Sequence, residues 1–248
     1  MDPRIRRRRI EVRRNEGRRR LRVLLALLVI LVVTGGGLLA VRSSLLDVDH
    51  IEVEGAARST PEAVVAASGL RRGTAMTKVD ATPMLAAIEG LPWVRRADVR
   101  RDWPGTVVIT VEERVARAVS RSDSGLWALL DGEGRVLAEE AEPPAGLMPL
   151  EGVGPVPAPG VDAPSAGVPL VVLAALPPSL ANRVTAIVAG ERGEVELKLN
   201  PRGTVRFGTA ADAVAKVRAI ETLLASVDNR NLTILDVRFP SSPVLTRG

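Results

Sequence analysis

The stretch "LPWVRRADVRRDWPGTVVITVEER", residues 91–114, is the most strongly patterned part of the sequence. Its first half carries four arginines between two tryptophans, and its second half alternates branched apolar with polar residues, which is typical of a strand with one buried face. Pro104 and Gly105 separate the halves and predict a tight turn. We therefore expect a hairpin of two strands, 94–103 and 106–116. Three residues of the second strand share the face that we expect to be buried: Val107, Ile109 and Val111.

The segments before this hairpin predict one strand and two helices. Residues 48–55 alternate like a strand and end at a glycine. Thr60 followed by Pro61 is typical of a helix start. Pro83 indicates a second helix start, for which either Asp80 or Thr82 can be the N-terminal cap. A glycine follows each predicted helix as a stop signal. The predicted order is therefore strand, helix, helix, strand, strand.

Residues 118–239 have a different pattern, in which predicted hairpins alternate with segments rich in turn residues. Asp131 and Gly132 predict the turn of one hairpin, and residues 200–203 predict the turn of a second. Between the two hairpins, thirteen of the twenty-seven residues in 143–169 are proline or glycine, which predicts a loop or semi-rigid excursion.

Residues 209–227 predict the clearest helix of the chain. Thr209 and Asp212 have the spacing of a capping box, and five apolar residues form one stripe: Val214, Val217, Ile220, Leu224 and Val227. A short helix is expected before it in "LPPSLANRV". A last strand is expected over 232–239, followed by a tail at 240–248.

The N-terminal end is basic and then strongly apolar. Residues 1–22 hold eleven arginines and three acidic residues, whereas the remainder of the chain carries a net charge of −3. Residues 23–41 contain no charge, and a helix of this length spans about 28 Å, close to one hydrocarbon core. Flanking arginines disfavour a buried core helix, and the length of the arm and of the run disfavours a cleaved signal peptide. We expect a single transmembrane helix with residues 1–22 in the cytoplasm and residues 42–248 outside.

Arrangement and motif together resemble the FtsQ/DivIB family of bacterial cell-division proteins. The matching residues are Pro92, Trp93, Val94, Ala97, Val99, Arg101, Trp103, Pro104, Val111, Glu112, Glu113, Arg114 and Ala118. The resemblance implies an α+β protein, in which a β-α-α-β-β POTRA domain (46–117) precedes the β domain of this family (118–239), a mixed or antiparallel sheet with helices. It also implies a membrane protein of the septum.

Six residues make up the POTRA motif that we single out: Trp93, Arg101, Trp103, Pro104, Glu113 and Arg114. We expect both tryptophans to cover the small core where the helices meet the sheet. The arginines either lie on a solvated face or also dock another membrane protein.

Composition argues against chemistry and against nucleic acid. The chain has no cysteine, and its one histidine, His50, has no second histidine nearby, so neither a thiolate metal site nor a nucleophile–histidine pair is indicated. Asp131 and Glu133 fit a turn for local reasons. The body outside the basic arm is mildly acidic, unlike a nucleic-acid-binding domain. We expect no cofactor, no small-molecule substrate and no enzymatic activity.

Three function classes remain open. The first is a non-enzymatic protein with one membrane span that links division proteins at the septum, and the resemblance implies FtsB-like and FtsL-like single-span partners. The second is a POTRA-type polypeptide-binding or secretion factor. The third is a membrane-anchored cell-wall enzyme, which the missing site residues disfavour.

Candidate partner-binding residues lie near the C-terminal end. In the last strand, Asp236 and Arg238 share one face by the period of two, and Phe239 is expected on the inward face. Pro240 cannot donate to a ladder, so we expect this strand at or near a sheet edge, where a partner strand can add. The resemblance implies FtsB binding at this end, with Arg192 as a looser candidate and with a phenylalanine where a tyrosine is usual. The alternative is a solvated Arg238 and a core Phe239.

Overall fold

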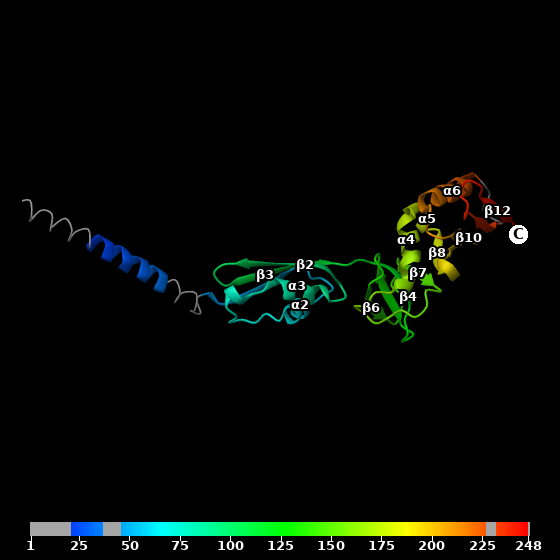
Figure 1. Ribbon diagram of the computed structural model, residues 1–248. Coiled ribbons are helices and arrows are strands. Elements are labelled where there is room, and N and C mark those ends of the chain that lie inside the picture. Colours follow the sequence, from blue (N-terminus) through cyan, green and yellow to red (C-terminus); the bar gives the residue numbers. More distant parts are fainter. Residues whose placement is uncertain (1–20, 37–45, 227–231, 248) are drawn as a thin grey trace, which may run out of the picture.

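The computed structural model describes residues 21–36, 46–226 and 232–247 (Figure 1). Residues 21–36 form a helix ahead of the rest, and most of their side chains are exposed. Among the described helices, none is long and apolar enough to cross a membrane. The predicted span 23–41 extends past this helix, and its last five residues lie outside the described part.

The first folded unit has the predicted order of strand, helix, helix, strand, strand. Its elements are β1 (His50–Glu54), α2 (Pro61–Ser68), the 3-10 turn η2 (Met76–Lys78), α3 (Ala81–Glu89), β2 (Val94–Asp102) and β3 (Thr106–Glu113). β3 is the central strand, parallel to β1 and antiparallel to β2. The three predicted core residues of β3 are at most 4% exposed and lie in the core between sheet and helices.

Local capping explains where the two helices begin and end. The Thr60 side chain accepts a hydrogen bond from the amide of Ala63, and Gly69 ends α2 in the left-handed conformation with φ of 66°. α3 begins after Asp80, whose carboxylate accepts from the amide of Thr82 at 3.1 Å. Of the two expected caps of α3, Asp80 is therefore the one used.

The two tryptophans of the motif do not both cover the core. Trp103 lies at the end of the β2–β3 hairpin and is 51% exposed, so its predicted core position was wrong. Trp93 is half-buried and packs against a separate cluster of the second unit, formed by Val119, Leu129 and Leu137. Trp103 stands in the turn after β2, where the strand alternation that buries the valines no longer applies. This is why its side chain is exposed.

The second unit is a nine-stranded mixed sheet in the order β12-β11-β10-β9-β8-β7-β4-β5-β6. The strands are β4 (Ala116–Arg121), β5 (Trp127–Asp131), β6 (Val136–Glu140), β7 (Met148–Glu151), β8 (Val184–Ala189), β9 (Val195–Leu199), β10 (Thr204–Gly208), β11 (Leu232–Asp236) and β12 (Val244–Arg247). Its helices are η3 (Pro164–Ala166), α4 (Gly167–Ala175), α5 (Pro178–Ala181), η4 (Glu191–Gly193) and α6 (Ala213–Ser226). The expected α+β architecture, with hairpins β5–β6 and β9–β10, is confirmed.

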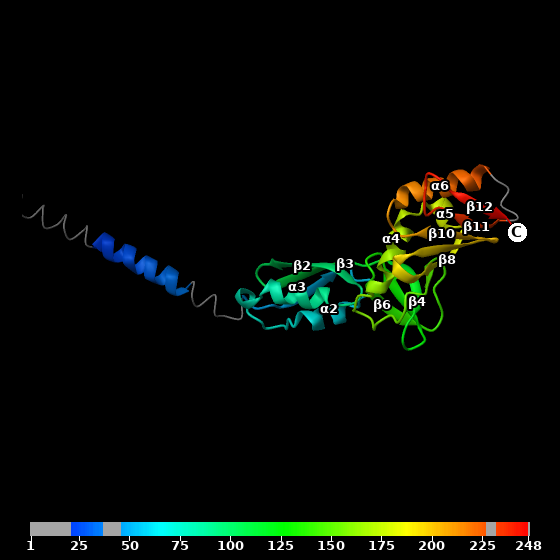
Figure 2. The same ribbon diagram turned by 45° about the vertical axis from the view of Figure 1, so that its right-hand side comes forward.

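Helix α6 packs over the β10–β12 end of the sheet (Figure 2). Val217, Ile220 and Leu224 are buried in the same core as Phe207, but Val214 is 61% exposed, and Val227 lies outside the described residues. The predicted capping box is wrong, because α6 begins at Ala213 and Asp212 before it has φ of 56°. The amphipathic stripe was thus predicted correctly only in its middle.

The proline- and glycine-rich segment 143–169 is not merely a loop. It contains β7, which lies between β4 and β8 in the middle of the sheet and is parallel to both. It also contains the first turn of α4. A four-residue strand that includes Pro149 is too short to show a periodic pattern, and for this reason β7 was not predicted from the sequence.

The C-terminal end differs from the expected strand and tail. β11 ends at Asp236 rather than at Phe239, and residues 244–247 form β12, the outermost strand. β11 therefore lies one strand inside the edge. The reason is the turn after β11, in which the amide of Ser242 donates to the carbonyl of Phe239 at 3.0 Å and returns the chain.

Candidate partner-binding surface

Asp236 and Arg238 form a clamp at the end of β11. The Arg238 guanidinium donates to both carboxylate oxygens, with Nη2 at 2.6 Å from Oδ2 and Nε at 3.0 Å from each oxygen, and the Arg238 amide donates to Oδ1 at 3.1 Å. These hydrogen bonds lower the pKa of Asp236, an effect that partial burial opposes. The side chains are 20% and 47% exposed, so the clamp presents a fixed guanidinium to solvent.

The neighbouring strands β9 and β10 form the surface against which the Arg238 side chain lies. A Cβ at Gly208 would lie 2.9 Å from Cγ of Arg238, so only glycine lets the arginine stem lie against β10. Arg238 lines a small hollow together with Glu194 and Arg206. Glu194 also acts electrostatically on Arg238, whose hydrogen bond to Asp236 is the main cause of its raised pKa. The surroundings of the Arg238 guanidinium are thus polar and mixed in charge.

An exposed apolar surface lies beside the clamp, at the turn between β11 and β12. Phe239 is 73% exposed, in contrast to its expected inward position, and Val244 at the start of β12 is 61% exposed. Pro240 is half-buried in this turn. Phe239 leaves the inward face because the strand ends before it, whereas Val237 is fully buried. Of the two edge strands of the nine-stranded sheet, β12 is the one beside the clamp.

Arg192 lies at the same end of the sheet but not in the clamp. It occupies η4 between β8 and β9 in a left-handed conformation, with φ of 57°, and its side chain is exposed. It is two residues from Glu194, which reaches the hollow at Arg238. The structure therefore brings four of the five candidate residues together at the β11–β12 turn and leaves Arg192 at the neighbouring loop.

Four residues of the POTRA motif have structural partners. Glu113 at the end of β3 accepts hydrogen bonds from the amides of Ala57, Arg58 and Ser59, which fixes the loop between β1 and α2. Arg101 donates to the carbonyl of Val79 at 2.7 Å, and Arg58 stacks over Trp93 at 5.2 Å. The fourth residue, Arg114, lies at the junction of the two units, whereas Trp103 and Pro104 are exposed.

Arg114 joins the first unit to the β5–β6 hairpin. Its Nη1 donates to Asp131 at 2.6 Å and to Glu133 at 2.9 Å, and Nε donates to the carbonyl of Val94 at 3.2 Å. Burial lowers the pKa of Arg114, but the two carboxylates more than reverse this, and the pKa lies above its usual value. Asp131 also accepts the amides of Glu133 and Arg135, so the expected local turn role is only part of its function.

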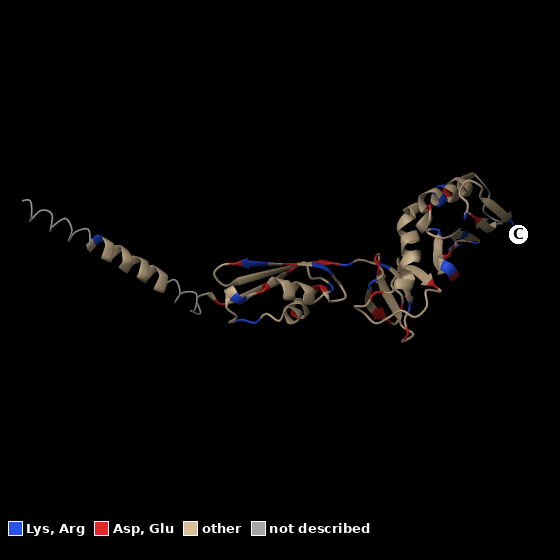
Figure 3. Cartoon of the chain, in the orientation of Figure 1, with Lys and Arg blue, Asp and Glu red and all other residues tan. Residues whose placement is uncertain are grey.

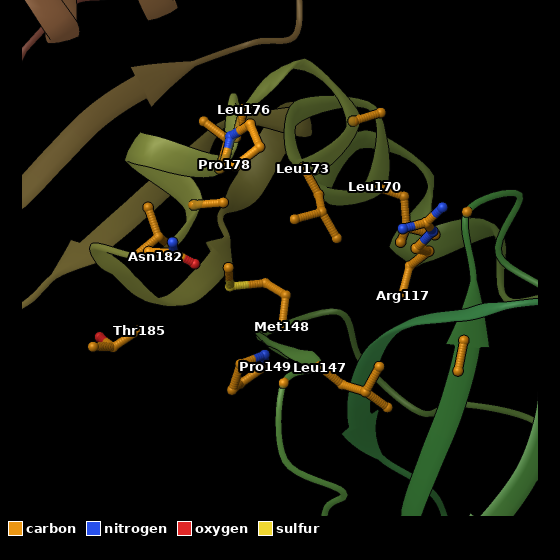
Figure 4. A pocket seen from close by; sticks show the side chains of 16 residues that line it. Arg117, Leu147, Met148, Pro149, Leu170, Leu173, Leu176, Pro178, Asn182 and Thr185 are labelled. Carbon is orange, nitrogen blue, oxygen red and sulfur yellow. The ribbon is translucent and has the colours of Figure 1, made fainter.

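A groove of about 820 Å³ opens between α4–α5 and strands β7 and β8 (Figure 4). Its floor is apolar, with Leu170, Leu173 and Met148 among its residues, and Arg117 lies at its rim. The lining residues include no acid, histidine or cysteine. In the described part of the chain, no three His, Cys, Asp or Glu side chains gather as metal ligands. His50 is exposed at the start of β1.

Sequence reasoning missed β12, the junction ion pair and the buried Lys216. Lys216 is 3% exposed, donates to the carbonyl of Thr209 and lies 5.2 Å from the Phe207 ring; burial lowers its pKa. From sequence alone, a buried lysine of an amphipathic helix cannot be told apart from a lysine on the surface of that helix. Arg114 and Asp131 are separated by seventeen residues and meet only in the folded chain.

Two family models cover most of the chain. The FtsQ-type POTRA domain matches residues 46–114, and the C-terminal domain of cell division protein FtsQ/DivIB matches residues 118–238. The first match coincides with the first folded unit, which we call the POTRA unit (residues 46–114), and the second match coincides with the unit of the nine-stranded sheet.

Relatives named cell division protein FtsQ align over much of the chain. The protein of Streptomyces collinus is 28% identical over 92% of this chain and 89% of its own length. That of Corynebacterium glutamicum is 27% identical over 76% and 83%, respectively. That of Mycobacteroides abscessus is 28% identical over 82% of this chain, and the match spans 63% of the relative. The chain belongs to the FtsQ/DivIB family of cell-division proteins.

Proposed function

We propose that this protein is a non-enzymatic component of the division machinery that crosses the membrane once and links other division proteins at the septum. The polar clamp beside an open strand edge carries this proposal. The residues that we propose for partner binding are Arg192, Asp236, Arg238, Phe239 and Pro240, and the proposed partners are FtsB-like and FtsL-like single-span proteins.

The exposed helix 21–36 supports membrane anchoring. Leu31 and Val33 are 68% and 67% exposed, and the whole uncharged run continues in sequence to Val41. A side chain of this kind costs about 1.5–3 kcal/mol when left in water rather than buried. Hydrocarbon removes this cost. By the positive-inside rule, the arginines before the run favour an N-terminus in the cytoplasm.

Strand addition at β12 supplies the proposed binding mode. An outermost strand carries unpaired amide and carbonyl groups that an incoming strand can use. Backbone pairing provides affinity but little choice of partner, so the choice comes from side chains. The fixed guanidinium of Arg238 favours a partner carboxylate, and the exposed ring of Phe239 favours an apolar side chain next to it.

Charge reversal at the clamp tests the binding mode. We expect Arg238→Glu to abolish co-purification with the FtsB-like protein while the chain stays folded, because two carboxylates then face the partner. Arg218→Glu on the exposed face of α6 is the matched control and should bind normally. Normal co-purification of a folded Arg238→Glu variant contradicts the proposed role of the clamp.

Topology and location are tested in cells. The chain has no cysteine, so a single cysteine at Ser43 gives an unambiguous label. We expect it to react with an impermeant thiol reagent in intact cells, whereas a cysteine at residue 2 stays unlabelled. A fluorescent fusion should form a mid-cell band during division. Uniform envelope staining would instead favour the alternative, a POTRA-type polypeptide-binding or secretion factor.

A further inference from the structure

The chain enters the POTRA unit at one end, and two loops flank the entry point. Val48 exchanges backbone hydrogen bonds with Gly73 and Thr74, at 2.9 and 2.8 Å. Asp49 donates its amide to the carbonyl of Gly105 at 2.8 Å, in the turn of the β2–β3 hairpin. The 70–74 loop and the hairpin turn therefore lie on the side that faces helix 21–36 along the chain (Figure 1).

An exposed indole marks this end. Trp103 has the largest apolar side chain that is more than half exposed among the described residues beyond helix 21–36. It precedes Pro104 at the tip of the hairpin, where neither the POTRA core nor the second unit covers it. An indole has an apolar body and one N–H donor, and this combination favours the boundary between hydrocarbon and water.

Two arginines flank the same entry point from the other loop. Arg71 and Arg72 are exposed, and neither guanidinium has an ion pair or hydrogen bond to the described part of the chain. Carboxylates are also present, since Asp47 and Asp49 lie at the entry and Asp102 pairs with Arg100 at 3.8 Å. The end is therefore mixed in charge, and three exposed cations there have no side-chain partner in the described part of the chain: Arg71 and Arg72 on the 70–74 loop and Lys78 in η2 (Figure 3).

Chain length keeps this end near the bilayer. The eight residues from 42 to 49 connect the end of the uncharged run to β1, and they reach at most about 29 Å when fully extended. The headgroup zone occupies about 6 Å on each side of the hydrocarbon core. Contact between the POTRA end and the headgroups is therefore well within the reach of the connection.

We propose that the end of the POTRA unit formed by Trp103, Arg71 and Arg72 rests on the lipid surface, with the indole among the headgroups and the guanidinium groups at lipid phosphates. This proposal rests on the membrane anchor proposed above. This contact fixes the height and tilt of the POTRA unit over the membrane, which attachment through the anchor alone does not do.

Quenching by a headgroup spin label tests the indole contact. The full chain is reconstituted into phosphatidylcholine vesicles that carry a nitroxide on the headgroup, and tryptophan fluorescence is measured. We expect lipid-dependent quenching in the wild type that Trp103→Phe removes and that Trp127→Phe, the control in the second unit, retains. Equal quenching in the wild type and in Trp103→Phe overturns the proposal.

The arginines are tested by adding phosphatidylglycerol to the vesicles. We expect the anionic lipid to increase quenching of Trp103, and Arg71→Gln with Arg72→Gln to remove the increase. High salt should do the same in the wild type, because a Debye length of about 3 Å at 1 M screens exposed charges. Arg202→Gln with Arg218→Gln is the control at distant sites. An increase that survives in the Arg71/Arg72 variant overturns the assignment of the phosphates to this loop.

Flotation after alkaline carbonate treatment separates this proposal from the anchor. A chain that floats with the vesicles but shows no quenching of Trp103 retains its anchor and overturns only the surface contact. A chain that remains at the bottom of the gradient overturns both.

Discussion

Two arginine–aspartate pairs of this molecule have the same closest distance but different surroundings. Arg114 and Asp131 meet at 2.6 Å at the junction of the two units, with side chains 14% and 6% exposed. Arg238 and Asp236 also meet at 2.6 Å, beside the open edge, with 47% and 20% exposed. The first pair lies between two parts of the protein itself, whereas the second faces solvent. This difference in burial supports an architectural role for the first pair and the recognition role that we propose for the second.

The largest expected effect comes from breaking the buried pair. Arg114→Ala removes the ion-pair partner of Asp131, whose side chain is nearly inaccessible to water, and we expect the free energy of unfolding to fall by about 3 kcal/mol. The measurement is denaturant unfolding of the full chain in detergent. Arg117→Ala is the neighbouring control, because Arg117 forms no ion pair with any residue that the structure describes. A loss below about 0.5 kcal/mol would show that the junction is held by other contacts.

The apolar side of the junction comes next. Trp93 packs on the cluster of Val119, Leu129 and Leu137 but is only half-buried. We expect Trp93→Ala to cost about 2 kcal/mol, less than the ~3–5 kcal/mol of a fully buried aromatic side chain. The same unfolding experiment measures it. Additivity with Arg114→Ala would mean that the two contacts act independently, and we expect coupling because both join the same two units.

The exposed clamp should respond to acid with a smaller change in stability. The folded-state pKa of Asp236 lies below its unfolded value, so the clamp contributes stability above about pH 4, the ordinary aspartate pKa, and loses it as pH falls through the lowered folded value. Melting temperature against pH, compared between the wild type and Arg238→Gln, measures this contribution. Parallel curves between pH 5 and 2 would be inconsistent with a pKa lowered by Arg238.

The smallest effect is expected at Trp103. Its side chain is half exposed, so Trp103→Ala should change the free energy of unfolding in detergent by no more than about 0.5 kcal/mol. This outcome would complete the contrast with Trp93, the other tryptophan of the motif. A loss of several kcal/mol would restore Trp103 to the core and remove the basis for its contact with lipid.

Periodic segments were predictable from sequence, and contacts between distant segments were not. β3 and the middle of α6 were assigned correctly because Val107, Ile109 and Ile220 repeat at the period of their element. β7 and β12 have four residues each, too few for a period to appear. In the candidate surface, the period of two correctly placed Asp236 and Arg238 on one side. Phe239 failed the same rule because the chain turns before it.

The pairing of β1 with β3 has a mechanical consequence. β1 starts at the end where the chain enters, and β3 runs parallel to it and leaves at the opposite end toward the second unit. When the proposed anchor and a partner at β12 pull in opposite directions, the two strands are drawn past each other along their length. The register of five residue pairs from His50–Thr106 to Glu54–Thr110 then resists the force together, rather than opening one pair at a time. In the proposed arrangement, the POTRA unit thus carries tension between its two ends without unzipping.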